Sequence, residues 1–169
     1  RDLLDEYKEE GRKVAVFSFF RQVLDDVSTL VGGCAQIHGS ISAEERQRVL
    51  DRFAAQEGFG VIALQIEAGG VGINLQCAQV VILMEPQFKP STERQAIARV
   101  RRMGQTRKVN AHRLIAQGTI DEALVLLIEE KKRVFEDYAQ HSSVKAASVM
   151  AMDAGSAAME ELKGVIARG

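Results

Sequence analysis

The chain has 169 residues, of which 46% are hydrophobic and 27% are charged, and its formal net charge is −1. This length suits one domain of ordinary size plus an appendage, and the hydrophobic share excludes a wholly disordered chain. The balanced charge excludes a protein that coats nucleic acid by bulk charge, so a nucleic-acid role requires a local basic patch. No apolar run approaches the roughly 18 residues of a membrane span, and two cysteines cannot form a disulfide framework or a four-ligand zinc site. We expect a soluble intracellular protein of the cytoplasm, nucleoid or nucleus, with no membrane partner and no metal ligands of its own.

Short apolar segments alternate with longer amphipathic segments along the chain. The predicted strands lie at residues 14–17, 34–37, 61–64, 80–84 and 109–115. The predicted helices cover residues 21–30, a segment opened by the capping box Ser42-Ala43-Glu44-Glu45, about 91–103, and about 120–138. Strands that alternate with helices predict an α/β fold, in which a parallel sheet carries helices on both faces.

Three parts are expected in this order. Residues 1–13 form a lead-in helix that continues from an upstream chain, so the sequence reads as a piece of a longer polypeptide. Residues 14–118 form the α/β domain, and residues 119–169 form a C-terminal helical extension. The extension becomes rich in Ala, Ser and Met, which predicts one or two weakly anchored helices there.

Basic residues concentrate between residues 85 and 113, where eight Lys or Arg stand against two Glu. In a chain of net charge −1, this asymmetry predicts a polyanionic partner. Within the segment, Gln95, Arg99 and Arg102 follow i, i+4, i+7 spacing and would share one stripe of a helix, beside an apolar stripe. Guanidinium groups oriented in this way suit phosphate oxygens, although spacing alone equally allows a solvated basic face.

A glycine cluster, Gly69-Gly70-Val71-Gly72, follows the apolar strand at 61–64. Glycines in this place allow the backbone to approach a ligand at the carboxyl end of a parallel strand, and a tight turn without a ligand is the alternative. The chain contains no Gly-Lys dipeptide, so it lacks the phosphate-binding loop G-x-x-x-x-G-K-[ST]. It is therefore not expected to hydrolyse ATP by itself.

Four motifs occur in the order found in Swi/Snf-type ATPases. They are Phe17-Ser18-Phe19-Phe20, Ile37-His38-Gly39-Ser40 with Arg46, Glu67 to Leu75, and Gln95 to Gln105. The turn from Glu85 to Pro90 is similar to the Asp-Pro-x-Trp-Asn-Pro turn of that family. From about Val14 to Lys132 the chain resembles the second RecA-like lobe of these DNA translocases.

The resemblance implies a nucleotide site that is shared with a first RecA-like lobe of the same polypeptide. That lobe would hold most of the contacts to ATP and Mg2+. Arg99 and Arg102 would be the arginine fingers that stabilise charge on the transferring γ-phosphoryl group. Gln95 would help to position them, and Gly72 would line the nucleotide side of the cleft.

The resemblance also implies double-stranded DNA as a partner, with a DNA-bound protein as a further candidate. The residues that would follow the DNA backbone are Ser18, Gly39, Ser40, Gly69 and Gly70. Backbone contacts suit a motor that moves over any sequence. The helix at 120–138 resembles the brace that crosses the lobes in this family, although it equally reads as a cap on this domain.

The chain departs from the family pattern at four positions. Glu67 stands where Ser or Thr is common, Arg101 replaces a His between the two fingers, and Phe88 and Lys89 replace Trp and Asn. Two other functions remain open from the sequence. One is a lobe of an RNA helicase, and the other is a non-catalytic DNA-binding module that has the same fold.

Overall fold

The computed structural model describes residues 1–68, 73–101 and 107–141, with residues 135–141 as backbone alone. The chain divides into two compact units, residues 1–121 and 122–169, and each is considered by itself. No helix in the described ranges is long and apolar enough to cross a membrane.

The first unit is built on a five-stranded sheet in which every paired strand is parallel. The strand order is β2-β3-β1-β4-β5, so β1 lies in the middle of the sheet. The strands are β1 (Lys13–Ser18), β2 (Ala35–Ile37), β3 (Gly60–Gln65), β4 (Val80–Leu83) and β5 (Asn110–Arg113). The α/β class and the parallel sheet predicted from the sequence are confirmed.

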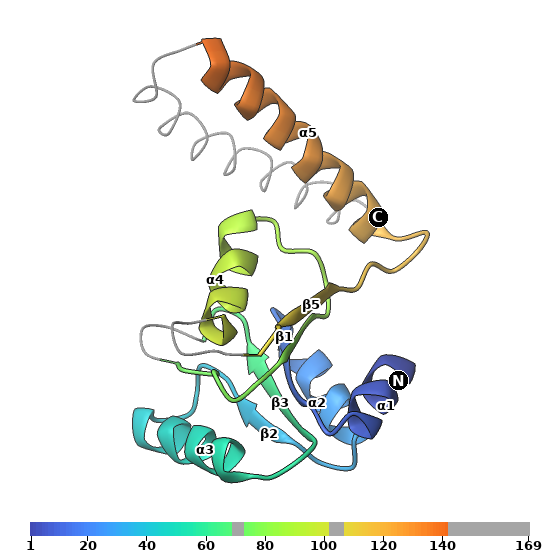
Figure 1. The fold of residues 1–169 in the computed structure, drawn as a ribbon. Helices are drawn as coiled ribbons and strands as arrows, with labels where there is room; N and C mark the ends of the chain where they lie inside the picture. Colours follow the sequence, from blue (N-terminus) through green and yellow to red (C-terminus); the bar gives the residue numbers. More distant parts are fainter. Residues whose placement is uncertain (69–72, 102–106, 142–169) are drawn as a thin grey trace. The chain divides into compact units, whose positions relative to one another are not determined.

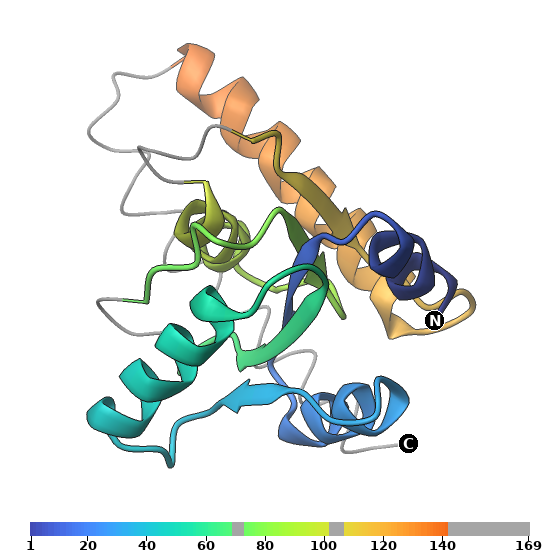
Figure 2. The same cartoon turned by 60° about the horizontal axis from the view of Figure 1, so that its bottom comes forward.

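Helices cover both faces of this sheet (Figures 1 and 2). The helices α3 and α4 lie on one face, and α1 and α2 lie on the other. Their bounds are α1 (Asp2–Glu9), α2 (Arg21–Leu30), α3 (Ala43–Ala55) and α4 (Pro90–Val100). A further helix, α5 (Ile120–His141), begins at the end of the first unit and continues into the second.

The central strand β1 is buried on both faces, because its alternate side chains enter two different cores. Ala15 and Phe17 belong to the core beneath α3 and α4, whereas Val14 and Val16 belong to the core beneath α1 and α2. The second core also contains Tyr7 of α1. The lead-in helix therefore packs on the sheet as part of the first unit.

The predicted N-terminus of α3 is confirmed in its main feature. The Ser42 hydroxyl accepts a hydrogen bond from the backbone amide of Glu45 at 3.1 Å. The Glu45 carboxylate does not reach back to close the capping box, because it pairs with Arg48 at 3.1 Å and Arg52 at 3.3 Å instead. The cap is thus a serine cap rather than a complete reciprocal box.

The predicted end of α4 is wrong, because the helix ends at Val100 rather than near residue 103. Arg101 leaves helical geometry with φ −85° and ψ 77°. The amide of Leu75 donates to the carbonyl oxygen of Arg99 at 3.1 Å. This carbonyl belongs to the last turn of α4, whose carbonyl oxygens have no partners within the helix, and the Leu75 amide supplies it with a tertiary one.

Candidate functional site

The chain leaves β1 and β4 toward opposite faces of the sheet. The helix α2 follows β1 on one face, and α4 follows β4 on the other. In a parallel sheet this arrangement opens a crevice beyond the carboxyl ends of the two strands, where ligands characteristically bind. The candidate site therefore lies at the edge of the sheet that the carboxyl ends of its strands form.

Glu85 joins the ends of β1 and β4. Its carboxylate accepts a hydrogen bond from the backbone amide of Phe19 at 2.6 Å and one from the Ser18 hydroxyl at 2.9 Å. The side-chain amide of Gln87 donates to the same carboxylate at 2.7 Å. Ser18 has no exposed surface, and its hydroxyl oxygen also accepts from the Phe20 amide at 3.0 Å. The predicted DNA contact of Ser18 stays a prediction, and a direct contact would require its hydroxyl to leave Glu85.

Gln65 joins the ends of β1, β2 and β3 in the same way. Its side-chain amide donates to the carbonyl oxygen of Phe19 at 3.2 Å, and its Oε1 accepts from the amide of Gly39 at 3.3 Å. The Ser40 hydroxyl lies 2.8 Å from Nδ1 of His38 and 3.4 Å from a guanidinium nitrogen of Arg21. Gly39 and Ser40 are both exposed. Three of the residues predicted for DNA, Ser18 included, thus meet at one edge of the sheet.

Two phenylalanines stand exposed at this edge. Phe19 is 44% exposed and Phe20 is 56% exposed, and their rings meet edge to face with centroids 5.4 Å apart. Sequence reasoning quoted both in a motif but gave them no role. The sequence carried no clear signal of their exposure, since Met84, which directly follows the fully buried β4, packs against the core.

Of the predicted nucleotide residues, the structure describes Gln95 and Arg99, and Arg99 is the one with an unsatisfied side chain. It is half-buried, and its buried Nη1 has no hydrogen-bond partner among the described residues. Burial lowers the pKa of its guanidinium from the ordinary value, because the charged form loses water without gaining a counter-charge. A buried donor without an acceptor is costly, and a bound anion would supply both the acceptor and the counter-charge. Gln95 on the same helix is exposed.

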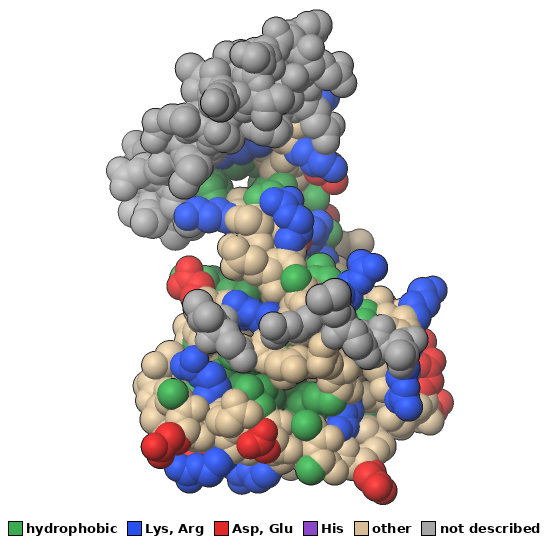
Figure 3. All heavy atoms as spheres, turned by 60° about the vertical axis from the view of Figure 1, so that its left-hand side comes forward, with side chains coloured by type: hydrophobic (Ala, Val, Ile, Leu, Met, Phe, Trp, Pro, Cys, Tyr) green, Lys and Arg blue, Asp and Glu red, His purple; other side chains and the backbone are tan. Residues whose placement is uncertain are grey.

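The basic segment at residues 85–113 arranges its charges unevenly. Its two carboxylates turn inward, because Glu93 is 5% exposed and pairs with Arg113, while Glu85 lies in the network at the sheet edge. Figure 3 shows exposed Lys and Arg side chains on one side of the molecule, with hydrophobic side chains between them. The exposed cations of the segment include Lys89, Arg94, Arg101, Arg107 and Lys108. The exposed surface of this segment therefore has a larger excess of positive over negative side chains than its amino-acid composition alone indicates.

Four predicted residues lie outside the described part of the chain. They are Gly69, Gly70, Gly72 and Arg102. The helix α4 ends at Val100, and the predicted grouping of Gln95 and Arg99 with Arg102 stays a prediction. Among the described residues, no group of three or more His, Cys, Asp or Glu is placed to hold a metal ion.

The profile of the helicase conserved C-terminal domain matches residues 1–104. The chain belongs to this family. In sequence it is 40% identical over 135 residues to the ATP-dependent helicase fft2 of Schizosaccharomyces pombe, covering 78% of this chain and 10% of that protein. It is 38% identical over 127 residues to the ATP-dependent helicase FUN30 of Saccharomyces cerevisiae, covering 73% of this chain and 11% of that protein. The chain thus spans about a tenth of the length of these relatives.

Two solved structures share the fold of this helicase C-terminal domain. The C-terminal part of the Fun30 ATPase domain matches with a TM-score of 0.71 and 35% identity, over 75% of this chain and 42% of that one. The Sulfolobus solfataricus SWI2/SNF2 ATPase core domain matches with a TM-score of 0.67 and 31% identity, over 80% of this chain and 28% of that one. The chain is therefore a RecA-like helicase C-terminal lobe of SNF2 type, as its motifs predict.

Proposed function

We propose that this chain is the C-terminal motor lobe of an ATP-dependent, double-stranded DNA translocase or remodeller of Swi/Snf type. It acts with a first RecA-like lobe of the same polypeptide, to which it supplies arginine fingers and contacts to the DNA backbone. One observation carries the proposal. Arg99 presents a half-buried guanidinium, one nitrogen of which has no hydrogen-bond partner in the described part of the chain, on a helix of the helicase C-terminal domain.

At the nucleotide, Arg99 and Arg102 stabilise the negative charge that develops on the γ-phosphoryl oxygens during hydrolysis. The desolvation of Arg99 serves this role, because a guanidinium that water does not screen interacts more strongly with an anion. Gln95 orients the fingers and Gly72 lines the cleft. Bound ATP supplies the phosphoryl group that is transferred, and the first lobe holds Mg2+ together with most of the phosphate contacts.

At the DNA, the exposed Ser40 offers a hydroxyl to the phosphates, the exposed Gly39 lets them approach the backbone closely while its amide stays bonded to Gln65, and Gly69 and Gly70 extend this track. The exposed cations of the basic segment add attraction that does not depend on base sequence. Ser18 contributes through its hydrogen bond to Glu85, which holds the edge in place. A DNA-bound protein is the further partner, and the relatives that are named as regulators of chromatin favour action in the nucleus.

The test compares the isolated chain with the full-length polypeptide. The isolated chain is expected to show negligible ATP hydrolysis with saturating duplex DNA, whereas the full-length protein hydrolyses ATP and is stimulated by the duplex. Robust hydrolysis by the isolated chain would reveal a nucleotide site that the sequence does not predict. A full-length protein without DNA-stimulated hydrolysis would favour a non-catalytic DNA-binding module, and separation of RNA strands would favour an RNA helicase.

A further inference from the structure

One buried carboxylate on α4 has no place in the mechanism described above. Glu93 is 5% exposed and lies in the first turn of the helix. It belongs to the stripe of α4 that also contains the buried Ala96 and Val100, three and seven residues later. An apolar side chain would fill this position at no electrostatic cost, whereas a carboxylate loses its water there.

The contacts of Glu93 compensate for this loss and tie three segments together. One carboxylate oxygen, Oε1, accepts from the backbone amide of Gln87 at 2.9 Å. The other, Oε2, accepts from Nε of Arg113 at 3.1 Å and also from its Nη2. Gln87 lies in the turn after β4, and Arg113 is the last residue of β5. The carboxylate therefore fixes the first turn of α4 against the ends of two neighbouring strands.

The same turn continues to the predicted DNA edge. The side chain of Gln87 donates to Glu85, which accepts from Ser18 and from the amide of Phe19. An unbroken series of hydrogen bonds thus runs from the end of β1, through Glu85, Gln87 and Glu93, to α4. The helix that carries Arg99 and the edge that carries Ser18 share one polar frame.

We propose that Glu93, held by Arg113, is a positioning residue that sets the rotation of α4 and so directs Arg99 toward the nucleotide when DNA is bound at the sheet edge. Glu93 and Arg99 lie on one rigid helix, so a small rotation at the first turn moves the guanidinium at the other end. Hydrophobic packing of Ala96 and Val100 tolerates such a rotation better than the three directional hydrogen bonds of Glu93 do. This inference rests on the proposed function, because it requires Arg99 to act on a phosphoryl group.

The experiment uses the full-length polypeptide with Glu93→Gln, which preserves shape and removes the charge. The Glu93 carboxylate accepts from Gln87 with one oxygen and from Arg113 with the other. The side chain of Gln has a single oxygen, so Glu93→Gln loses one of these two contacts. The turnover number of DNA-stimulated ATP hydrolysis is expected to fall about tenfold or more, as misplacement of a catalytic group predicts. The KM for ATP and the DNA concentration for half-maximal stimulation are expected to stay within about threefold, because neither binding surface is altered.

Two further comparisons separate positioning from simple loss of stability. Val16→Ala removes buried surface on the opposite face of the sheet and serves as a control for destabilisation. It is expected to lower the melting temperature while turnover stays within about twofold, provided that the assay temperature remains below the transition. Arg113→Lys is expected to retain most of the turnover, because both donors of Arg113 meet one oxygen and a single ammonium group can replace them. Arg113→Met is expected to behave like Glu93→Gln.

Turnover in Glu93→Gln within twofold of the unmodified protein would overturn the inference. The inference would also be overturned if Val16→Ala, at an equally lowered melting temperature, lost as much turnover as Glu93→Gln. A third contradicting result would be an Arg113→Lys variant with turnover as low as that of Arg113→Met. The proposed function fails by a different result, namely no DNA-stimulated hydrolysis in the unmodified protein or full turnover in Arg99→Ala. The two failures are therefore distinguishable in one set of assays.

Discussion

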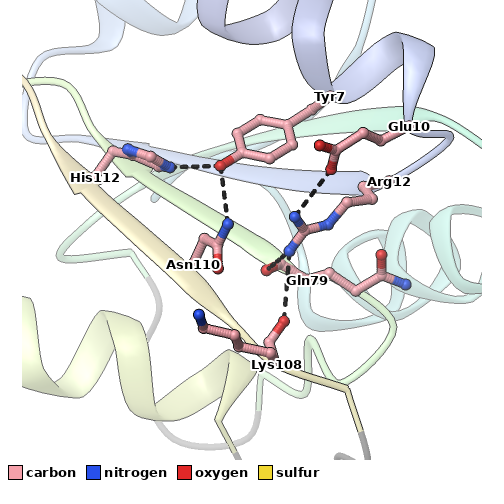
Figure 4. Close-up of polar contacts among 7 residues, drawn as sticks. All are labelled: Tyr7, Glu10, Arg12, Gln79, Lys108, Asn110 and His112. Atoms are coloured by element: carbon pink, nitrogen blue, oxygen red, sulfur yellow. Dashed lines mark hydrogen bonds and ion pairs between the residues drawn. The ribbon is translucent and has the colours of Figure 1, made fainter.

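Arg12 and Arg99 are both partly buried arginines of the same sheet domain, and their surroundings differ completely. Arg12 donates to the Glu10 carboxylate at 3.0 Å, to the carbonyl oxygen of Gln79 at 3.1 Å and to that of Lys108 at 3.4 Å. Its guanidinium also lies 4.9 Å from the centre of the Tyr7 ring. Figure 4 shows the polar contacts of this guanidinium, all of which come from the protein itself.

Arg99 has no such surroundings in residues 1–68, 73–101 and 107–141, where its buried Nη1 finds no acceptor. The Arg12 network continues through the Tyr7 hydroxyl, which lies 2.7 Å from Nε2 of His112 and accepts from the side-chain amide of Asn110 at 3.1 Å (Figure 4). That network fastens α1 to β5. The contrast supports the proposal that Arg99, unlike Arg12, interacts with an anion from outside the domain.

The largest expected effect is on catalysis by Arg99. In the full-length protein, Arg99→Ala is expected to reduce DNA-stimulated ATP hydrolysis roughly 10³-fold or more, which is the range of arginine-finger removal. Arg102→Ala is expected to act similarly, and ATP binding is largely retained in both. Steady-state hydrolysis and binding of a fluorescent ATP analogue measure the two effects. The melting temperature should not fall in Arg99→Ala, because an unpaired desolvated charge is removed. Retained turnover would exclude the finger role for the substituted residue.

Arg12→Ala is expected to show the reverse pattern. Loss of three hydrogen bonds from a charged donor and of the Tyr7 contact should lower the free energy of unfolding by about 2 kcal/mol. DNA-stimulated hydrolysis by the folded full-length protein should change less than about twofold. Urea denaturation of the chain followed by circular dichroism measures the first quantity. Arg52→Ala is the matched control, since the Arg52 side chain is 74% exposed and its loss should cost less than about 0.5 kcal/mol. Equal stability of the two variants would contradict the comparison.

Tyr7→Phe tests a smaller part of the same network. It removes the hydroxyl that joins Asn110 and His112 while it keeps the ring beneath Arg12. The free energy of unfolding should fall by about 1 kcal/mol, which is the usual net value of such hydrogen bonds. The effect is expected to be smaller than that of Arg12→Ala in the same denaturation assay. A larger decrease in the free energy of unfolding than that of Arg12→Ala would show that the Tyr7 hydroxyl stabilises the fold more than the Arg12 guanidinium does.

The smallest expected effects are those of pH on the two cysteine thiols, which are partly buried. Burial raises the pKa of Cys34 and of Cys77, because the thiolate is the form that loses water. The stability that the protonated thiols contribute to the folded state is therefore fully present below the pKa of the unfolded thiols. It is lost as pH rises through the pKa of the thiols in the folded state. Alkylation by iodoacetamide at neutral pH should be slower in the folded chain than in urea, and the difference should narrow at alkaline pH. Equal alkylation rates in the folded and unfolded chain would show that the thiols are accessible and that folding does not raise their pKa.

The order and type of the elements followed from local sequence pattern. Apolar runs such as Val80 to Leu83 have to be buried on both faces, and the serine before α3 marks a helix start whatever the rest of the chain does. The motifs were equally local, so the RecA-like helicase lobe was predicted from them and confirmed. The end of α4 was not predictable, because the Leu75 amide that ends it comes from 24 residues earlier along the chain.

The site shows the same division. Spacing grouped Gln95 with Arg99, and motif order grouped Ser18 with Gly39 and Ser40. Sequence could not show that Ser18 is buried, because its hydroxyl is satisfied by a carboxylate from the turn after β4, on a strand that neighbours β1 only in the folded sheet. Nor could it show which carboxylates of the basic segment turn inward.

The sequence alone determined the strand and helix alternation and the family of the lobe, since each depends on neighbours within a few residues. Only the tertiary structure decided which polar groups find partners. Hydrogen bonds such as those of Glu85, Glu93 and Arg12 join residues that are distant in the chain. Whether a buried guanidinium is satisfied or left open for a ligand depends on which strands lie side by side, and local sequence carries no record of that.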